Sequence, residues 1–321
     1  MPDQPVRLFA HTDIDIPAAQ ALLRQYDGKA VIDDLRRIPE GSSTSNYAVG
    51  LRSGRKLLLK LYPEDGGRGA REMAAYRYAA KVAKVPEVYW YDGSRSVFHR
   101  PYAVIEFIEG AGLSHYVMET RGLPVEMARR IGERLALLHG REYGRMALLG
   151  ESLEEERELL PVSALHAHYL NGKPGSLISP GVRGDVLGFL AEHTEMLDEL
   201  EARAVFSHGD FSFGNMIVDG AGEVWFIDFE YALAAPPYQD IGRFFRDKTG
   251  VSQWLDRLAF NGFICGYNAC TAHPLGEDWY GLSRLMDMTS LLHLLNYDSA
   301  ACWAGDIEEE IGHTLRVLRQ V

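Results

Sequence analysis

The first third of the chain consists of short apolar runs separated by turns rich in glycine, proline and charged residues. Residues 47–51 alternate weakly, residues 56–62 form an apolar run that one lysine interrupts, and Ser53-Gly54 between them is a turn signal. Two such runs around a short turn predict a β-hairpin. Residues 88–91 and 103–107 are rich in valine, isoleucine and aromatic side chains, which predicts two further strands.

Helical patterns begin between these strands and dominate after Gly110. The stretch 70–84 is rich in alanine and has helical character. Residues 124–139 are amphipathic at the helical period. Their apolar face consists of Met127, Ile131, Leu135 and Leu138. Further helices are predicted at residues 151–160, at residues 185–203 and over most of residues 251–321.

The change from strands to helices falls near residues 107–111 and predicts two parts, residues 1–107 and residues 108–321. So short a junction cannot be a free linker, and the two parts are therefore expected to share a cleft. We predict an α+β fold of two lobes, a small antiparallel sheet with one helix followed by a larger, mostly helical lobe. A length of 321 residues with 46% apolar side chains is enough for the core of such a fold.

Charge and cysteine content narrow the class of protein. With 33 Lys and Arg against 45 Asp and Glu, the net charge is −12, and the sequence lacks the basic runs that nucleic-acid binding requires. No stretch is long and apolar enough to span a bilayer, and the first residues do not resemble a signal peptide. We therefore expect no nucleic-acid or membrane partner, and a cytoplasmic location. The three cysteines form no C-x-x-C pair, so we expect buried thiols rather than disulfides.

Candidate chemistry concentrates around one predicted hairpin. Residues 216–218 and 224–227 are short apolar runs joined by a turn of aspartate and glycine, so they should pair as antiparallel strands. This pairing places Asn215, just before the first strand, beside Asp228, just after the second. Asp210 precedes Asn215 by a short loop. Two carboxylates and an amide are therefore expected to converge at one end of the hairpin.

Oxygen ligands of this kind suit Mg²⁺, which takes few protein ligands and shares phosphate oxygens. Asp210 need not bind the metal, because it could instead accept the proton of an attacking hydroxyl. The alternative is that Asp210 and Asn215 only cap turns. The second acid at Asp228, at a matching spacing, favours the functional interpretation.

The motif His-Gly-Asp-x-x-x-x-Asn followed by Ile-Asp-Phe resembles the aminoglycoside phosphotransferase and choline kinase superfamily. The resemblance implies a protein-kinase-like fold in which Asp210 is the catalytic base. It implies that Asn215 and Asp228 hold Mg²⁺. It also implies structural roles for His208, which would brace the loop, and for Asp240 downstream.

The same resemblance requires a lysine and an acid in the first lobe. Lys60 lies in an apolar strand, and Glu72, early in the next helix, is expected to orient it. The predicted hairpin register places Lys60 opposite Tyr47, beside a loop of small residues that resembles the phosphate-binding loop of the aminoglycoside kinases. The loop residues expected to contact ATP are Ser42, Ser43, Thr44 and Asn46. The alternatives are an edge-strand lysine that points to solvent and an ordinary surface acid.

The end of the last strand of the first lobe is the expected hinge. Backbone groups of Glu106, Phe107 and Ile108 are placed there to contact adenine, which is an inference from position alone. Glu230 stands where many relatives have glycine, and the sequence Asp-Phe-Glu-Tyr looks more like the choline kinases. Glu230 and Tyr231 are therefore expected to face the acceptor.

The resemblance implies an ATP- and Mg²⁺-dependent phosphotransferase that moves the γ-phosphate to a hydroxyl of a small molecule. Aminoglycosides, choline-like amines, amino alcohols and sugars all remain possible acceptors, and the enzyme is expected to be a monomer or homodimer. The A-P-E motif of protein kinases is missing, so protein substrates are not expected. The alternative is a catalytically inactive pseudokinase that binds nucleotide and acts through partners.

Two other signals are assigned to structure. His166 and His168 lack a partner at a metal-binding spacing and are interpreted as surface residues. Four aromatic residues could form a box for a quaternary ammonium group, but core packing is favoured. These are Tyr231, Tyr238, Trp279 and Trp303.

Overall fold

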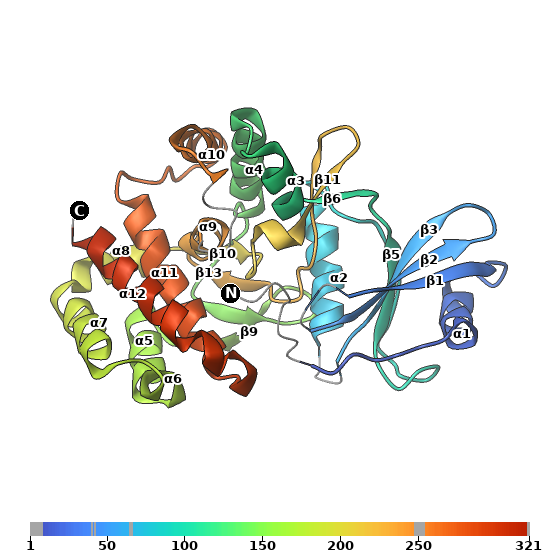
Figure 1. The fold of residues 1–321 in the computed structure, drawn as a ribbon, viewed down its shortest axis with the longest axis horizontal. Coiled ribbons are helices and arrows are strands. Elements are labelled where there is room, and N and C mark those ends of the chain that lie inside the picture. The colour runs from blue at the N-terminus through green and yellow to red at the C-terminus, as the bar shows by residue number, and fades with distance from the viewer. Residues whose placement is uncertain (1–8, 40, 42, 64–66, 247–253, 320–321) are drawn as a thin grey trace.

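The structure is a computed structural model that describes residues 9–39, 41, 43–63, 67–246 and 254–319. A five-stranded antiparallel sheet lies at one end of the molecule, and helices make up most of the other end (Figure 1). The strand order is β1-β2-β3-β5-β4. The bounds are β1 Ile32–Ile38, β2 Ser45–Leu51, β3 Lys56–Leu61, β4 Val88–Asp92 and β5 Tyr102–Glu106.

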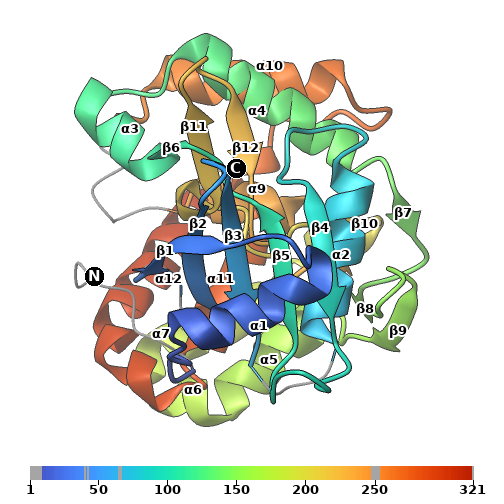
Figure 2. The same cartoon turned by 90° about the vertical axis from the view of Figure 1, so that its right-hand side faces the viewer.

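A helix lies on each face of this sheet (Figure 2). Helix α1, Ile16–Tyr26, begins at Asp15, whose carboxylate accepts a hydrogen bond from the Ala18 N–H. It packs against the apolar side chains at positions 57, 59 and 61 of β3. Side chains alternate along a strand, so Lys60 points to the opposite face, where α2, Arg68–Ala79, lies. The sheet thereby separates an apolar layer from the polar face that carries the site.

The predicted hairpin and strands are confirmed, with a register one residue from the expected one. Lys60 pairs with Asn46 rather than Tyr47. The shift arises because the loop is asymmetric: Leu51 bonds to Arg55, and Gly54 takes a left-handed φ of 84°. Helix α1 and strand β1 were not expected, because the many charges of β1 hide its alternation, as is common on a sheet edge.

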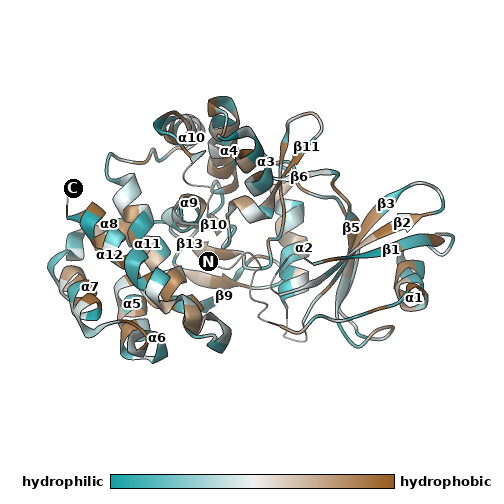
Figure 3. Cartoon of the chain, in the orientation of Figure 1, coloured by the Kyte–Doolittle hydropathy of each residue, from teal (hydrophilic) through white to brown (hydrophobic). Residues whose placement is uncertain are grey.

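The helical part is held by close contacts between helices. Helix α4, Val125–Leu138, is the predicted amphipathic helix, and it packs against α10, Arg257–Ala269. A Cβ atom at Gly132 would lie 2.1 Å from a carbonyl oxygen of α10, so glycine is required for this approach. Apolar and hydrophilic residues alternate around these helices (Figure 3). Further helices are α3 Leu113–Thr120, α5 Val162–Asn171, α6 Lys173–Ser176, α7 Pro180–Glu192, α8 Thr194–Glu201, α9 Tyr238–Phe244, α11 Trp279–Leu294 and α12 Ala304–Leu318.

Two small sheets complete the fold, with strand orders β12-β11-β6 and β7-β10-β13-β8-β9. Their bounds are β6 Gly110–Gly112, β7 Glu142–Tyr143, β8 Ala147–Leu149, β9 Glu155–Glu158, β10 Ala204–Ser207, β11 Met216–Asp219, β12 Val224–Phe226 and β13 Leu233–Ala235. The β11–β12 hairpin is the one that the sequence predicts. Its register places Asn215 opposite Ile227 rather than Asp228, because Met216 pairs with Phe226.

Three local predictions are wrong. Residues 151–160 contain strand β9 rather than a helix, because pairing with β8 overrides the helical propensity of a glutamate-rich segment. The three cysteines are exposed and free, since small neighbours do not determine burial. His166 is buried within α5, where its Nδ1 lies 2.7 Å from the Val162 carbonyl oxygen. Among the helices of the described ranges, none is long and apolar enough to cross a membrane.

Candidate active site

Lys60 is the central cation of the site. Its ammonium lies 2.7 Å from Glu72 Oε1 and 2.7 Å from Asp228 Oδ1, and the residue is 3% exposed. Burial by itself would lower the pKa of Lys60, but the charges of Asp228 and Glu72 together outweigh it and hold the pKa well above its ordinary value. Strand β3 is central in the sheet, so Lys60 is not the solvent-facing edge lysine of the alternative interpretation.

Glu72 connects Lys60 to helix α2. It is fully buried, and its second oxygen accepts a hydrogen bond of 2.5 Å from the Tyr62 hydroxyl. Burial raises the pKa of Glu72, whereas the charge of Lys60 opposes the rise. Because Lys60 is charged and 2.7 Å away, Glu72 forms a buried ion pair with it. Glu72 is therefore not the ordinary surface acid of the alternative interpretation.

Asp228 follows β12 in a backbone conformation that is unusual for a residue with a side chain. Its φ is 68°, in the left-handed region. Such a conformation costs on the order of 1–3 kcal/mol and is concentrated at functional sites. Two contacts fix it here: the Asp228 N–H donates to the Tyr76 hydroxyl at 2.9 Å, and the carboxylate accepts from Lys60.

Asp210 and Asn215 meet in the loop before β11. The Asn215 amide donates to the Asp210 carbonyl at 2.8 Å and to its Oδ2 at 2.9 Å. The other carboxylate oxygen accepts a hydrogen bond of 2.6 Å from Nε of Arg243 in α9. Burial raises the pKa of Asp210, but the charge and hydrogen bond of Arg243 reverse the shift, and the pKa lies below its ordinary value. Asp210 is therefore ionised at neutral pH and able to accept a proton.

Asp240 braces the backbone that leads into Asp210. Its two oxygens accept hydrogen bonds from the N–H groups of His208 at 2.7 Å and Gly209 at 2.9 Å. His139 of α4 lies 3.1 Å from the same carboxylate. Burial raises the pKa of Asp240, but the contact with His139 and the other nearby donors outweigh burial, so the pKa lies below its ordinary value. Asp240 is thus a buried anion that fixes the loop, in keeping with its expected structural role.

Gly209 is required within this loop for two reasons. Its φ is 81°, which favours glycine, and a Cβ atom there would lie 2.1 Å from the Tyr231 carbonyl oxygen. The His-Gly-Asp motif therefore has a structural explanation at its middle position.

The loop of small residues joins the two lobes at Tyr231. The Ser43 hydroxyl lies 2.6 Å from the Tyr231 hydroxyl, and the Thr44 hydroxyl donates to Asn46 Oδ1 at 3.4 Å. Arg68 stacks on the Tyr231 ring at 5.3 Å. Ser42 lies outside the described residues. Tyr231 is therefore in contact with the first lobe, which the sequence did not predict.

Glu230 is buried beside the charged centre. It is 2% exposed, and its Oε2 has no hydrogen-bond partner among the described residues. Burial, and then the charge of Asp228, raises the pKa of Glu230 to about 8. The Arg71 guanidinium donates to its backbone carbonyl at 3.1 Å. The side chain therefore carries a proton for most of the time at neutral pH.

The expected hinge lies at the end of β5. The Glu106 N–H donates to the Glu87 carbonyl at 2.8 Å, and its carboxylate accepts from the Glu87 N–H at 3.1 Å. The N–H of Glu106 is therefore committed to the neighbouring strand segment. The backbone carbonyl of Glu106 and the backbone groups of Phe107 and Ile108 remain the candidates for contact with adenine.

The structure brings the two halves of the predicted site together at Ile227. The Ile227 N–H donates to the Asn215 carbonyl at 3.0 Å, and the Ile227 carbonyl lies 3.0 Å from His208 Nε2. Asp228, the next residue, contacts Lys60. A continuous chain of contacts therefore runs from the buried cation to the loop that carries Asp210.

The residues present fit a magnesium ion that also binds phosphate. Within the described ranges, no three His, Cys, Asp or Glu side chains are arranged to hold a metal. Asn215 uses its amide nitrogen for both contacts with Asp210, which leaves its oxygen for a ligand. Asp228 likewise uses Oδ1 for Lys60. One oxygen from each residue, completed by phosphate and water, matches the preference of Mg²⁺.

Arg243 is the main functional candidate that the sequence did not reveal. It lies three residues after Asp240 in α9, and its contact with Asp210 joins positions 33 residues apart. An arginine in a short helix carries no signal of such a contact. Tyr62 and Tyr76 were missed for the same reason, because their hydroxyls act through the tertiary structure.

Sheet, helices and site together define a two-lobed, protein-kinase-like fold. The model of the Phosphotransferase enzyme family matches residues 34–271, which is most of the chain. The protein therefore belongs to this family.

Comparison with solved structures supports the fold. A candidate fructosamine-3-kinase from Thermobifida fusca is 17% identical with a TM-score of 0.64, covering 94% of this chain and 98% of that one. Aminoglycoside phosphotransferase APH(4)-Ia, in a ternary complex with ADP and hygromycin B, is 16% identical with a TM-score of 0.65, covering 94% and 98%. Macrolide 2'-phosphotransferase MphH from Brachybacterium faecium is 14% identical with a TM-score of 0.62, covering 94% and 97%. No curated protein sequence matches the chain.

Proposed function

We propose that this member of the family transfers the γ-phosphate of ATP to a hydroxyl group of a small molecule. The observation that carries the proposal is the position of Lys60, which lies 2.7 Å from both Glu72 and Asp228. A buried lysine held between two acids has its ammonium fixed, and such a fixed charge is suited to bind phosphate oxygens. Complexes of similar structures with ADP support the choice of an adenine nucleotide.

Asp210 is the proposed base. Its carboxylate accepts the proton of the acceptor hydroxyl while the oxygen forms a bond to the γ-phosphorus and the bond to the leaving ADP breaks. The Asn215 amide and Arg243 orient the carboxylate, one on each oxygen. When bound, Mg²⁺ at Asn215 and Asp228 would neutralise the phosphate charge. The chain itself supplies position and a fixed cation, which dominate catalysis of this reaction.

The lobes divide the task in this proposal. Residues 1–107 would hold the nucleotide, with Ser43, Thr44 and Asn46 over the phosphates. The adenine would lie at residues 106–108, where the two parts join. Residues 108–321 would hold the acceptor near Glu230 and Tyr231. Acceptors to compare are aminoglycosides, macrolides, fructosamines, choline-like amines, amino alcohols and sugars.

A panel of these acceptors with ATP and Mg²⁺, scored by ADP release, tests the proposal. Replacing Asp210 by Asn should reduce turnover by roughly 10²–10⁴-fold and leave ATP binding intact. The matched control is Asp198→Asn, an exposed acid of α8, which should behave like the wild type. Normal turnover in Asp210→Asn would overturn the assignment of the base. ATP binding without transfer to any acceptor would favour the pseudokinase instead.

A further inference from the structure

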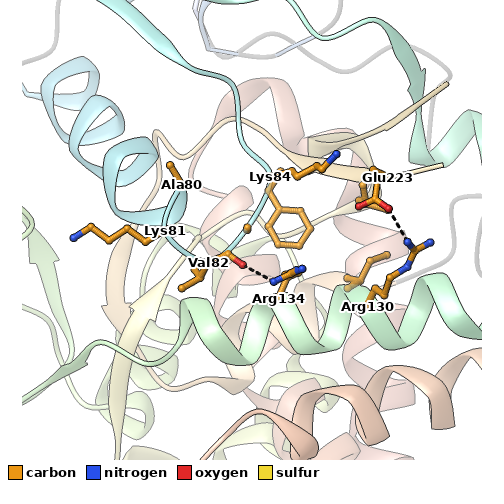
Figure 4. Close-up of a pocket in the computed structure, with 11 residues that line it drawn as sticks. Ala80, Lys81, Val82, Lys84, Arg130, Arg134 and Glu223 are labelled. Carbon is orange, nitrogen blue, oxygen red and sulfur yellow. Dashed lines mark hydrogen bonds and ion pairs between the residues drawn. The ribbon is translucent and has the colours of Figure 1, made fainter. Parts of the chain in front are cut away.

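A pocket lies outside the candidate active site. It has a volume of about 270 Å³ and is formed by the segment after α2, by α4 and by β12 (Figure 4). None of its lining residues belongs to the candidate active site. Its volume is slightly below the range of about 300–1,000 Å³ that is usual for pockets that bind drug-sized molecules, so only a small ligand would fit.

The floor of the pocket is apolar. Ile131 of α4 and Phe226 of β12 line it, and each is 1% exposed within the protein core. Val82 and Val224 are only half-buried, so they supply most of the apolar surface that a ligand can reach. A floor of this kind favours a ligand with a flat or compact apolar part.

The rim of the pocket is positively charged. It carries Lys81, Lys84, Arg130 and Arg134, against a single lining acid, Glu223. Figure 4 shows that Lys81 points away from the other three cations. A local excess of positive charge is unexpected in a chain with a net charge of −12, and it favours an anionic group on the ligand.

The contacts of these cations leave donors for a ligand. Arg130 pairs with Glu223 at 2.8 Å. The Lys84 ammonium lies 3.9 Å from Asp219 and 5.3 Å from the centre of the Trp225 ring, both outside the pocket. Surface ion pairs such as Arg130–Glu223 contribute only about 0–1 kcal/mol. Among the described residues, the Arg134 guanidinium makes one hydrogen bond, of 3.2 Å, to the Val82 carbonyl. That bond orients the group and leaves most of its five donors for an anion.

We propose that this pocket binds a small organic anion, with its apolar part on Val82 and Val224 and its carboxylate, sulfonate or phosphate group on Arg134 and Lys84. The site is distinct from the ATP cleft of the proposed function. It lies where the backbone of Phe226 donates to the Lys84 carbonyl at 2.9 Å, two residues before Asp228. A ligand there would contact the segment that follows α2 and the strand that leads to Asp228.

Titration calorimetry with 1-naphthalenesulfonate, and with the uncharged 1-naphthalenesulfonamide of the same shape, tests the proposal on the full chain. The sulfonate should bind at least about tenfold more tightly than the sulfonamide, and Arg134→Gln should remove the difference. Arg77→Gln, an exposed arginine of α2 outside the pocket, should retain it. Should Arg134→Gln fail to fold, Lys84→Gln is the second variant, with an expected loss of about threefold or more.

Saturating ATP and Mg²⁺ should not displace the sulfonate. Equal affinity for the two probes would overturn the proposal, as would retention of the difference in Arg134→Gln and Lys84→Gln. Displacement by ATP would place the anion in the nucleotide cleft and would equally overturn it. The measurement requires no phosphoryl transfer, so its outcome is independent of the proposed enzymatic activity.

Discussion

The contact between Asp210 and Arg243 offers a quantitative test of the site that requires no knowledge of the acceptor. The hydrogen bond from Arg243 Nε is 2.6 Å long, and the side chains of Asp210 and Arg243 are 32% and 26% exposed. The perturbation is a double-mutant cycle with Asp210→Asn, Arg243→Met and the combination of both. The two single variants remove one partner each, and the double variant removes the charge pair altogether.

The expected coupling energy lies between the surface and interior limits. Two unit charges about 4 Å apart interact by roughly 4 kcal/mol at an effective dielectric constant of about 20, and by about 1 kcal/mol in water. About two-thirds or more of each side chain is buried, so we expect a coupling of roughly 1–3 kcal/mol. Each single change should be destabilising at neutral pH, because each leaves a largely buried charge without its partner.

The assay is urea unfolding of the four proteins at low ionic strength, at neutral pH and again near pH 3. The pKa of Asp210 is lowered in the folded state, so the pair stabilises the protein above the ordinary aspartate pKa. This contribution is lost as the pH falls through the lowered value. The coupling energy should therefore be largest at neutral pH and should decrease in acid.

Additive effects would refute this reasoning. If the single changes sum to the double change within about 0.3–0.5 kcal/mol, Arg243 does not stabilise the Asp210 carboxylate, and the lowered pKa has another cause. A coupling that is the same at both pH values would also contradict it, because a charge pair must weaken when Asp210 is protonated.

Three further changes test other parts of the site. Lys60→Met should abolish measurable ATP binding and reduce the free energy of unfolding by about 3–5 kcal/mol, because it leaves Glu72 and Asp228 without a cation. The control is Lys56→Met, which changes an exposed lysine of the same strand. Calorimetry with ATP would contradict the prediction if both variants bound ATP equally well. Glu230→Gln should raise the melting temperature at pH 9 more than at pH 5. The buried acid has a pKa of about 8 instead of 4.5, so its ionisation destabilises the folded state progressively over that interval, by up to roughly 5 kcal/mol; an equal effect at both pH values would argue against a raised pKa. Gly209→Ala should lower the free energy of unfolding by more than about 2 kcal/mol, because it combines a left-handed φ with a Cβ too close to Tyr231. Gly220→Ala, which has open space, should change it little in the same urea titration.

Sequence patterns correctly predicted the elements that depend on neighbouring residues alone. The hairpin around Ser53-Gly54 followed from alternation and a turn signal, and the β11–β12 hairpin followed from two apolar runs around a turn. The one-residue errors in both registers have the same origin. The register depends on which loop residue takes a left-handed conformation, as Gly54 does. One glycine-containing loop sequence is compatible with several loop conformations, and therefore with several registers.

Contacts distant in sequence were beyond such reasoning unless a motif carried them. Lys60 and Asp228 are 168 positions apart, and only the resemblance to a family suggested that they meet. Arg243 belongs to no motif that the sequence offered, so its contact with Asp210 was missed. The glutamate-rich segment that forms β9 was predicted to be a helix. Its helical propensity stabilises a helix less than pairing with β8 stabilises the strand.

The local charge around Asp210 also limits what the overall charge says about the acceptor. A net charge of −12 favours a cationic acceptor only if the excess of acids reaches the site. Beyond Arg243, Arg246 forms a bidentate pair with Asp287, and Arg284 contacts Asp287 and Glu310. Asp287 and Glu310 therefore each face an arginine. Burial raises the pKa of Glu230 to about 8, so this acid is largely protonated at neutral pH. Neutral, polyhydroxylated acceptors are consequently tested with the same priority as amines in the acceptor panel, because Asp287, Glu310 and Glu230, three acids that could attract a cationic acceptor, are paired with arginine or protonated.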